Sequence, residues 1–130
     1  VMPKVEVSVG ELIDKITILE IKQERIEDEA KLTHVNTELD ILRATVEQEK
    51  ISVPQELVQE LKAINIELWD AEDVIRICEK EGDFGGAFID CARLDATLND
   101  KRFLAKNKIN ECTKSLVKEQ KSYEGLYTTN

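Results

Sequence analysis

Two pairs of polar residues on neighbouring expected helices form the main candidate binding site of this sequence. Asp73 and Arg76 follow each other at helical spacing, and so do Asn99 and Arg102. Side chains three or four residues apart lie on the same side of a helix. Such a cluster could hold an anion through its arginines, or it could be a solvated face without a ligand.

The two interpretations predict different neighbours. A solvated face would pair Asp73 with Arg76 along one helix, which stabilises it by roughly a few tenths of a kcal/mol. It would also place Arg93 and Asp95, across the turn, nearer to Arg76 than Arg102 is. The alternative is a polar layer inside the bundle. Arg102 lies on the row that becomes the apolar face of its helix, so a carboxylate from the first or third helix would have to pair with it.

The sequence completes neither a di-iron nor a hydrolase pattern. A di-iron bundle needs two Glu-x-x-His repeats, whereas the single histidine, His34, has no acid three residues before it. No credible Ser/His/Asp or Cys/His arrangement is present. The glycines of the segment 82–86 lack the preceding strand and the lysine of a phosphate-binding loop. We therefore expect no catalytic residues, no bound metal and no cofactor.

One magnesium-dependent alternative stays open. All-α nucleotide pyrophosphohydrolases bind magnesium through acids clustered on two helices. Glu67 and Asp70 fit one half of that pattern, and Glu20 and Glu24 fit the other half loosely. Magnesium accepts a few carboxylates together with water, so the residue types suit it.

A chorismate mutase-like enzyme is the other catalytic alternative. The segment Ile13-Asp-Lys-Ile16 has the Ile-Asp-x-Ile pattern of the first helix of that class. The class stabilises a dianionic transition state with inward-facing cations. Here Arg25, Arg76 and Arg102 would have to converge.

Composition bounds the remaining possibilities. The 130 residues suggest a single helical domain spanning 1–130, and 35% of them are charged. The net charge of −9 argues against nucleic-acid binding, which needs a basic face. No apolar run approaches the ~20 residues of a membrane span, and no signal-peptide pattern opens the chain. We expect an acidic cytoplasmic protein whose three cysteines are free thiols.

The segment 8–26 is the expected centre of the fold. Ser8 and Glu11 have capping-box spacing at a helix start. Leu12, Ile16 and Leu19 continue a helical stripe that further isoleucines widen. A helix apolar over so much of its surface needs neighbours on two sides.

The other expected helices follow from local signals. Asp28 caps a second helix, with a narrow coiled-coil-like seam. A third begins near Pro54, where Ser52 and Gln55 repeat the capping-box spacing, and ends at Gly82. A fourth is capped by Asp83 and runs over 87–121, longer than the others, with Phe84 as an apolar plug beneath the turn. Cys91, Leu94 and Leu98 form one seam of this helix, and Ala105, Ile109, Cys112 and Leu116 form a second.

The chain resembles a small family of bacterial and phage-borne proteins of unknown function. The resemblance rests on Gly10-Glu-Leu-Ile-Asp-Lys-Ile-Thr-Ile-Leu-Glu-Ile-Lys22, on the block 68–76, on Gly82-Asp-Phe-Gly85 and on Asn99-Asp-Lys-Arg102. It implies a self-contained domain and brings no activity.

Together these patterns predict an all-α antiparallel bundle of about four helices with a short extended N-terminal segment, where Val5, Val7 and Val9 alternate. An overlong fourth helix would need a partner, so we expect a homodimer that acts as a protein-interaction or accessory module, with an unknown protein partner. An anion-binding protein or an enzyme, with Asp73, Arg76, Asn99 and Arg102 as binding residues, is the alternative.

Overall fold

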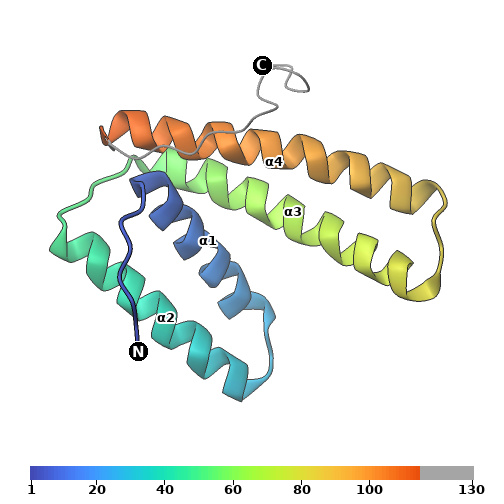
Figure 1. Cartoon of the computed structure of the whole chain (residues 1–130), viewed down its shortest axis with the longest axis horizontal. Helices are drawn as coiled ribbons and strands as arrows, with labels where there is room; N and C mark the ends of the chain where they lie inside the picture. The colour runs from blue at the N-terminus through green and yellow to red at the C-terminus, as the bar shows by residue number, and fades with distance from the viewer. Residues whose placement is uncertain (115–130) are drawn as a thin grey trace.

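A computed structural model describes residues 1–114 of the chain, which form four α-helices. α1 (Val9–Arg25) and α2 (Glu29–Gln48) form one antiparallel hairpin. α3 (Gln55–Glu81) and α4 (Gly86–Cys112) form a second, longer one, and the two hairpins spread apart from the end where α1 begins (Figure 1). No strand occurs in the described part, so the predicted all-α bundle is confirmed.

α1 is the central helix of the bundle, because it packs against each of the other three. Leu12, Ile16 and Leu19 are buried in the core cluster, and Ile21 is 1% exposed. The same core contains Leu39 of α2 and, from the second hairpin, Leu61, Leu68, Leu98 and Ile109. The prediction that α1 needs neighbours on two sides is confirmed. Within the described residues no helix is both long and apolar enough to cross a membrane.

Most helix ends follow the predicted signals. The Ser8 hydroxyl accepts from the Glu11 N–H at 3.0 Å, and Asp28 caps α2 through the Lys31 N–H at the same distance. Gly82 ends α3 in the left-handed conformation, with φ of 69°. The break between the first two helices, which no glycine or proline marks, lies at residues 26–28.

Two predicted caps are wrong. Pro54 itself stands at the N-cap of α3 and offers no side-chain hydrogen bond, so Ser52 does not cap this helix. Gly85 is the N-cap of α4; the Asp83 carboxylate instead accepts from the Gly85 N–H within the turn. Phe84 is not a plug, because it is 54% exposed; its ring packs edge-to-face with Phe88. The turn lies beyond the core, so there is nothing for a plug to fill.

α4 is shorter than predicted. It ends at Cys112, and with 27 residues it equals α3 in length; the predicted end at Lys121 and the seam residue Leu116 lie outside the described residues. Leu98, Ala105 and Ile109 are buried as the seams predict, whereas Leu94 and Cys112 are exposed. The part of the α3–α4 hairpin next to its turn projects past α1 and α2 (Figure 1).

The N-terminal segment is an irregular chain without strand structure. Val5 is 80% exposed, and Val7 is exposed as well. The alternation of valines is therefore not the signature of a paired strand here, since a lone strand has no neighbour to satisfy its backbone groups.

Candidate functional site

A buried ion pair joins α1 to α4 at the centre of the molecule. The Asp14 side chain is 1% exposed, and the Arg102 guanidinium binds both of its oxygens, Nε to Oδ1 at 2.9 Å and Nη2 to Oδ2 at 2.5 Å. This two-point geometry is the strongest form of a carboxylate–arginine contact. Arg102 is thus paired with a carboxylate of the first helix, as the polar-layer interpretation requires.

Asn65 of α3 completes this network and has a defined orientation. Its Nδ2 donates to Asp14 Oδ1 and to Thr17 Oγ1, both at 2.9 Å. Thr17 donates its own hydroxyl proton to the Asp14 carbonyl at 2.8 Å, so its oxygen can only accept from Asn65. The amide group of Asn65, 5% exposed, must therefore turn its NH₂ towards α1 and its carbonyl oxygen away from it.

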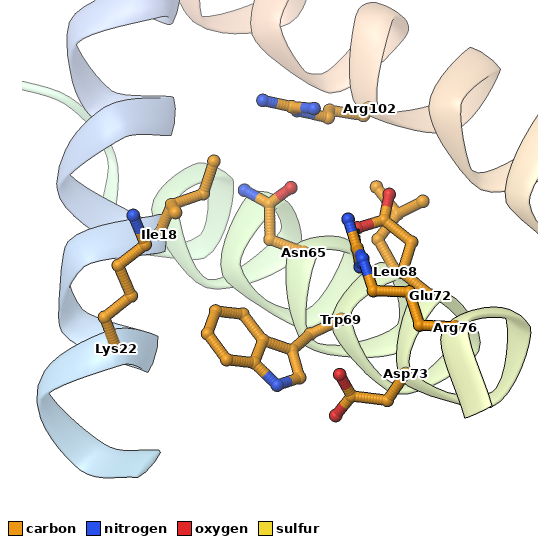
Figure 2. Close-up of a pocket in the computed structure, with 9 residues that line it drawn as sticks. All are labelled: Ile18, Lys22, Asn65, Leu68, Trp69, Glu72, Asp73, Arg76 and Arg102. Atoms are coloured by element: carbon orange, nitrogen blue, oxygen red, sulfur yellow. Dashed lines mark ion pairs between the residues drawn. The ribbon is translucent and has the colours of Figure 1, made fainter. Parts of the chain in front are cut away.

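A pocket of about 330 Å³ opens beside this network, between α1, α3 and α4. Figure 2 shows the side chains that line it: Ile18, Lys22, Asn65, Leu68, Trp69, Glu72, Asp73, Arg76 and Arg102. Cations thus reach it from three helices, with two carboxylates and one flat aromatic ring. Its volume lies at the lower end of the range of small-molecule sites.

The cations of the pocket differ in their partners. Arg102 is bound to Asp14, and Arg76 contacts Glu72 at 3.7 Å, one turn before it on α3. Lys22 forms no ion pair with any described residue. The Arg25 guanidinium lies over the ring of Trp69, 6.0 Å from its centroid, but only Lys22 of these two α1 cations lines the pocket.

Two carboxyl groups meet at the α3–α4 side of the pocket. Asn99 Nδ2 of α4 donates to Asp95 Oδ2 at 3.3 Å, and the buried Asp95 Oδ1 has no hydrogen-bond partner among the described residues. Partial burial raises the pKa of Glu72 above its ordinary value, and the neighbouring carboxyl group of Asp95 raises it further. The nearby Arg76 and Arg102 oppose this effect.

A protein-family model matches residues 3–130, which is nearly the whole sequence. The chain belongs to DUF6165, a family of unknown function. The resemblance to an uncharacterised domain family is confirmed, while the bacterial or phage origin stays a prediction. Searches of curated proteins and of solved structures gave no significant match.

The sequence-predicted site residues of this DUF6165 protein lie in one region, although not as one cluster. Asp73, Arg76 and Arg102 line the pocket. Asn99 does not line it; its Nδ2 donates to the carbonyl and the carboxylate of Asp95. The expected pair of Asp73 with Arg76 is not formed, and Arg76 contacts Glu72 instead.

The enzyme patterns do not assemble in the described residues. Glu20 and Glu24 bind Lys62, Asp70 binds Arg25, and Glu67 is exposed. In the part of the chain that the structure describes, no group of three acidic, histidine or cysteine side chains could hold a metal ion. Of the three arginines that a chorismate mutase-like site would need, Arg76 and Arg102 line the pocket and Arg25 does not.

The sequence interpretation did not include four residues of the candidate site, namely Asp14, Lys22, Asn65 and Glu72. The sequence does contain a signal that Asp14 is buried. This residue lies on the same side of its helix as Gly10, Thr17 and Ile21, so it places a charge among residues that carry none. A charge in such a row requires a buried partner. Nothing comparable marks Lys22 or Glu72, whose residue types are common on solvated helix faces.

Proposed function

We propose that this protein binds a small, hydroxyl- or amino-bearing organic anion in the pocket between α1, α3 and α4. The observation that carries the proposal is the convergence of Lys22 and Arg76, from two different helices, on one pocket of about 330 Å³. Lys22 has no described carboxylate to neutralise it. An anionic group of a ligand would supply that partner.

The remaining walls indicate what else the ligand carries. The carbonyl oxygen of Asn65 and the carboxylate of Asp73 both accept hydrogen bonds, so a ligand with hydroxyl or amino donors fits them. Trp69, Leu68 and Ile18 offer apolar surface, against which the carbon skeleton of a sugar or a ring would pack. The combination favours a compact polyhydroxylated or ring-bearing anion over a bare inorganic ion.

The single tryptophan of the chain makes the proposal easy to test. Trp69 lines the pocket, so its fluorescence should change when a ligand enters. Suitable probes are glucose 6-sulfate, glucose 6-phosphate and 4-hydroxybenzoate, with neutral glucose as the control. We expect saturable changes with at least one anion and none with glucose.

A pair of lysine variants separates pocket binding from general attraction of anions. Lys22→Met removes a pocket cation, whereas Lys15→Met removes an exposed cation on the same helix that does not line the pocket. Loss of one charge-assisted hydrogen bond should weaken binding by roughly tenfold in Lys22→Met and leave Lys15→Met unchanged. Equal affinities of the two variants, or no response to any anion, would contradict the proposal.

Self-association is a second candidate function, supported by exposed apolar side chains on the projecting α3–α4 hairpin. Ile77, Phe84, Ile89 and Leu94 are all exposed there. A second copy packed about a two-fold axis would cover them. Light scattering at several concentrations should then give twice the mass of 14.8 kDa, and a monomer at every concentration would exclude this candidate.

A further inference from the structure

The pocket is lined by two charged side chains that no described residue neutralises, and the two have opposite signs. Lys22 of α1 and Asp73 of α3 form no ion pair within residues 1–114. The two arginines of the lining, by contrast, each contact a carboxylate of the protein. A ligand with only a negative group would satisfy Lys22 and bring a second negative charge towards Asp73.

The two unpaired charges lie on different walls of the pocket. Figure 2 shows Lys22 on α1 and Asp73 on α3, with the ring of Trp69 between them. A ligand with a negative group at one end and an ammonium group at the other would supply a partner for each charge. Its carbon skeleton would then cover the aromatic ring.

Asn65 offers a different kind of contact from Asp73. Its carbonyl oxygen points away from α1, and no described residue donates a hydrogen bond to it. Asn65 and Asp73 are both on α3, and their separation of eight residues is roughly 12 Å along the helix. One ammonium group therefore cannot contact both side chains. The charged carboxylate of Asp73 is the stronger acceptor for a cation, which leaves Asn65 to accept from a hydroxyl group.

We propose that the ligand of this pocket is a zwitterion, with its negative group at Lys22 and an ammonium group at Asp73, as in an acidic amino sugar. The inference rests on the proposed function and narrows its ligand to anions that also carry an ammonium group. The charge of the whole chain agrees with it. At a net charge of −9 the protein repels a free anion at long range, whereas the opposite charges of a zwitterion offset each other.

The test exchanges one hydroxyl group of a ligand for an ammonium group. Glucose 6-sulfate and glucosamine 6-sulfate differ only in this exchange, and so do 4-(hydroxymethyl)benzoate and 4-(aminomethyl)benzoate. Affinities are measured by isothermal titration calorimetry at mildly acidic pH, where both amines are protonated. We expect the ammonium member of at least one pair to bind roughly fivefold more tightly, the factor that corresponds to a partly exposed ion pair.

Two acid variants test whether this preference comes from Asp73. Asp73→Asn removes the carboxylate charge with little change of shape, whereas Glu67→Gln removes an exposed charge of the same helix that does not line the pocket. The preference for the ammonium ligand should disappear in Asp73→Asn and persist in Glu67→Gln. Lys22→Met should weaken both members of a pair, because both carry the negative group.

The outcomes separate this inference from the proposed function. If anions bind through Lys22 but neither ammonium ligand binds more tightly than its hydroxyl counterpart, the zwitterion is overturned and the anion pocket stands. A preference that persists in Asp73→Asn also overturns the inference. Binding of unsulfated glucosamine as tightly as glucosamine 6-sulfate would indicate a cation site and contradict both proposals. If no ligand of either pair binds, both proposals fail.

Discussion

Asp14 places a charge in the interior, where an ionised carboxylate is tolerated only with a partner and further hydrogen bonds. Arg102 supplies the partner, Asn65 supplies a third donor, and Thr17 fixes the direction of Asn65. The four side chains come from α1, α3 and α4, so each helix depends on the other two for its place. The network thereby sets one wall of the pocket.

The buried pair gives a direct stability prediction. Asp14→Ala leaves Arg102 without its carboxylate and Asn65 without an acceptor, so it should lower the free energy of unfolding by about 3 kcal/mol. This is the lower end for a buried pair, because the Arg102 side chain remains 29% exposed. Urea denaturation measures the change.

A control exists at the surface, in an exposed ion pair between α1 and α3. Asp70→Ala breaks the pair of Asp70 with Arg25, in which Asp70 is 61% exposed, and it should cost less than about 1 kcal/mol. If both variants lost the same stability, the burial of Asp14 would not be what makes its pair important.

The sequence predicts Arg102 as a residue of this site, but it does not predict its buried partner Asp14. The sequence places Arg102 on an apolar row of its helix, and this position predicts a buried partner. The identity of the partner could not follow, because the choice between α1 and α3 depends on the angle at which the two hairpins meet. Lys22 and Glu72 belong to the pocket only through that same angle, and neither is distinguishable from a solvated residue by type or spacing.

At the scale of helices, the start of α1 is locked to the end of α4. The Gly10 N–H donates to Asn110 Oδ1 at 2.6 Å, and Lys106, 6% exposed, binds the Glu11 carboxylate at 2.9 Å. A Cβ atom on Gly10 would overlap the Lys106 carbonyl oxygen and lie 2.9 Å from Asn110 Oδ1. The two helix backbones meet this closely because residue 10 has no side chain.

Gly10→Ala therefore tests the crossing of α1 and α4. The extra methyl must push the helices apart, which should destabilise the protein by about 1–3 kcal/mol. Gly86→Ala is the control, because a Cβ there meets nothing within 4 Å, and it should be neutral or stabilising by up to about 1 kcal/mol. Thermal unfolding of the two variants gives the comparison, and an unchanged midpoint for Gly10→Ala would contradict the close crossing.

The caps at Asp28 and Gly82 follow their local signals, whereas the roles of Glu11 and Phe84 depend on contacts that only the tertiary structure sets. Asp28 and Gly82 act through their own backbone neighbourhood, so they stand where the sequence puts them. Glu11 has the spacing to complete a capping box, but its carboxylate binds Lys106 of α4 instead. Phe84 has the composition of a core residue, yet its turn lies beyond the reach of α1.

At the scale of the whole molecule, the hydrophobic core is concentrated around α1. The part of the α3–α4 hairpin next to the 82–86 turn extends beyond α1 and α2, and we call it the arm. Ile77 and Leu94 are exposed there, whereas Cys78 is buried. Two packed helices without a third bury little apolar surface, and regions with few buried contacts open at low free energy. Stability should therefore fall along the hairpin from the pocket towards Gly82.

Hydrogen exchange of backbone amides measures this gradient. We expect the amides of α1 between Leu12 and Ile21 to exchange through global unfolding, and those next to the 82–86 turn to exchange through local opening at a cost at least about 2 kcal/mol lower. Ile16→Ala, which truncates a buried core side chain, should lower global stability by about 2–5 kcal/mol. It should speed exchange in α1 and leave the turn unchanged, because local opening does not expose Ile16. Uniform protection along α3 and α4, or equal acceleration of both regions in this variant, would mean that the arm unfolds together with the core.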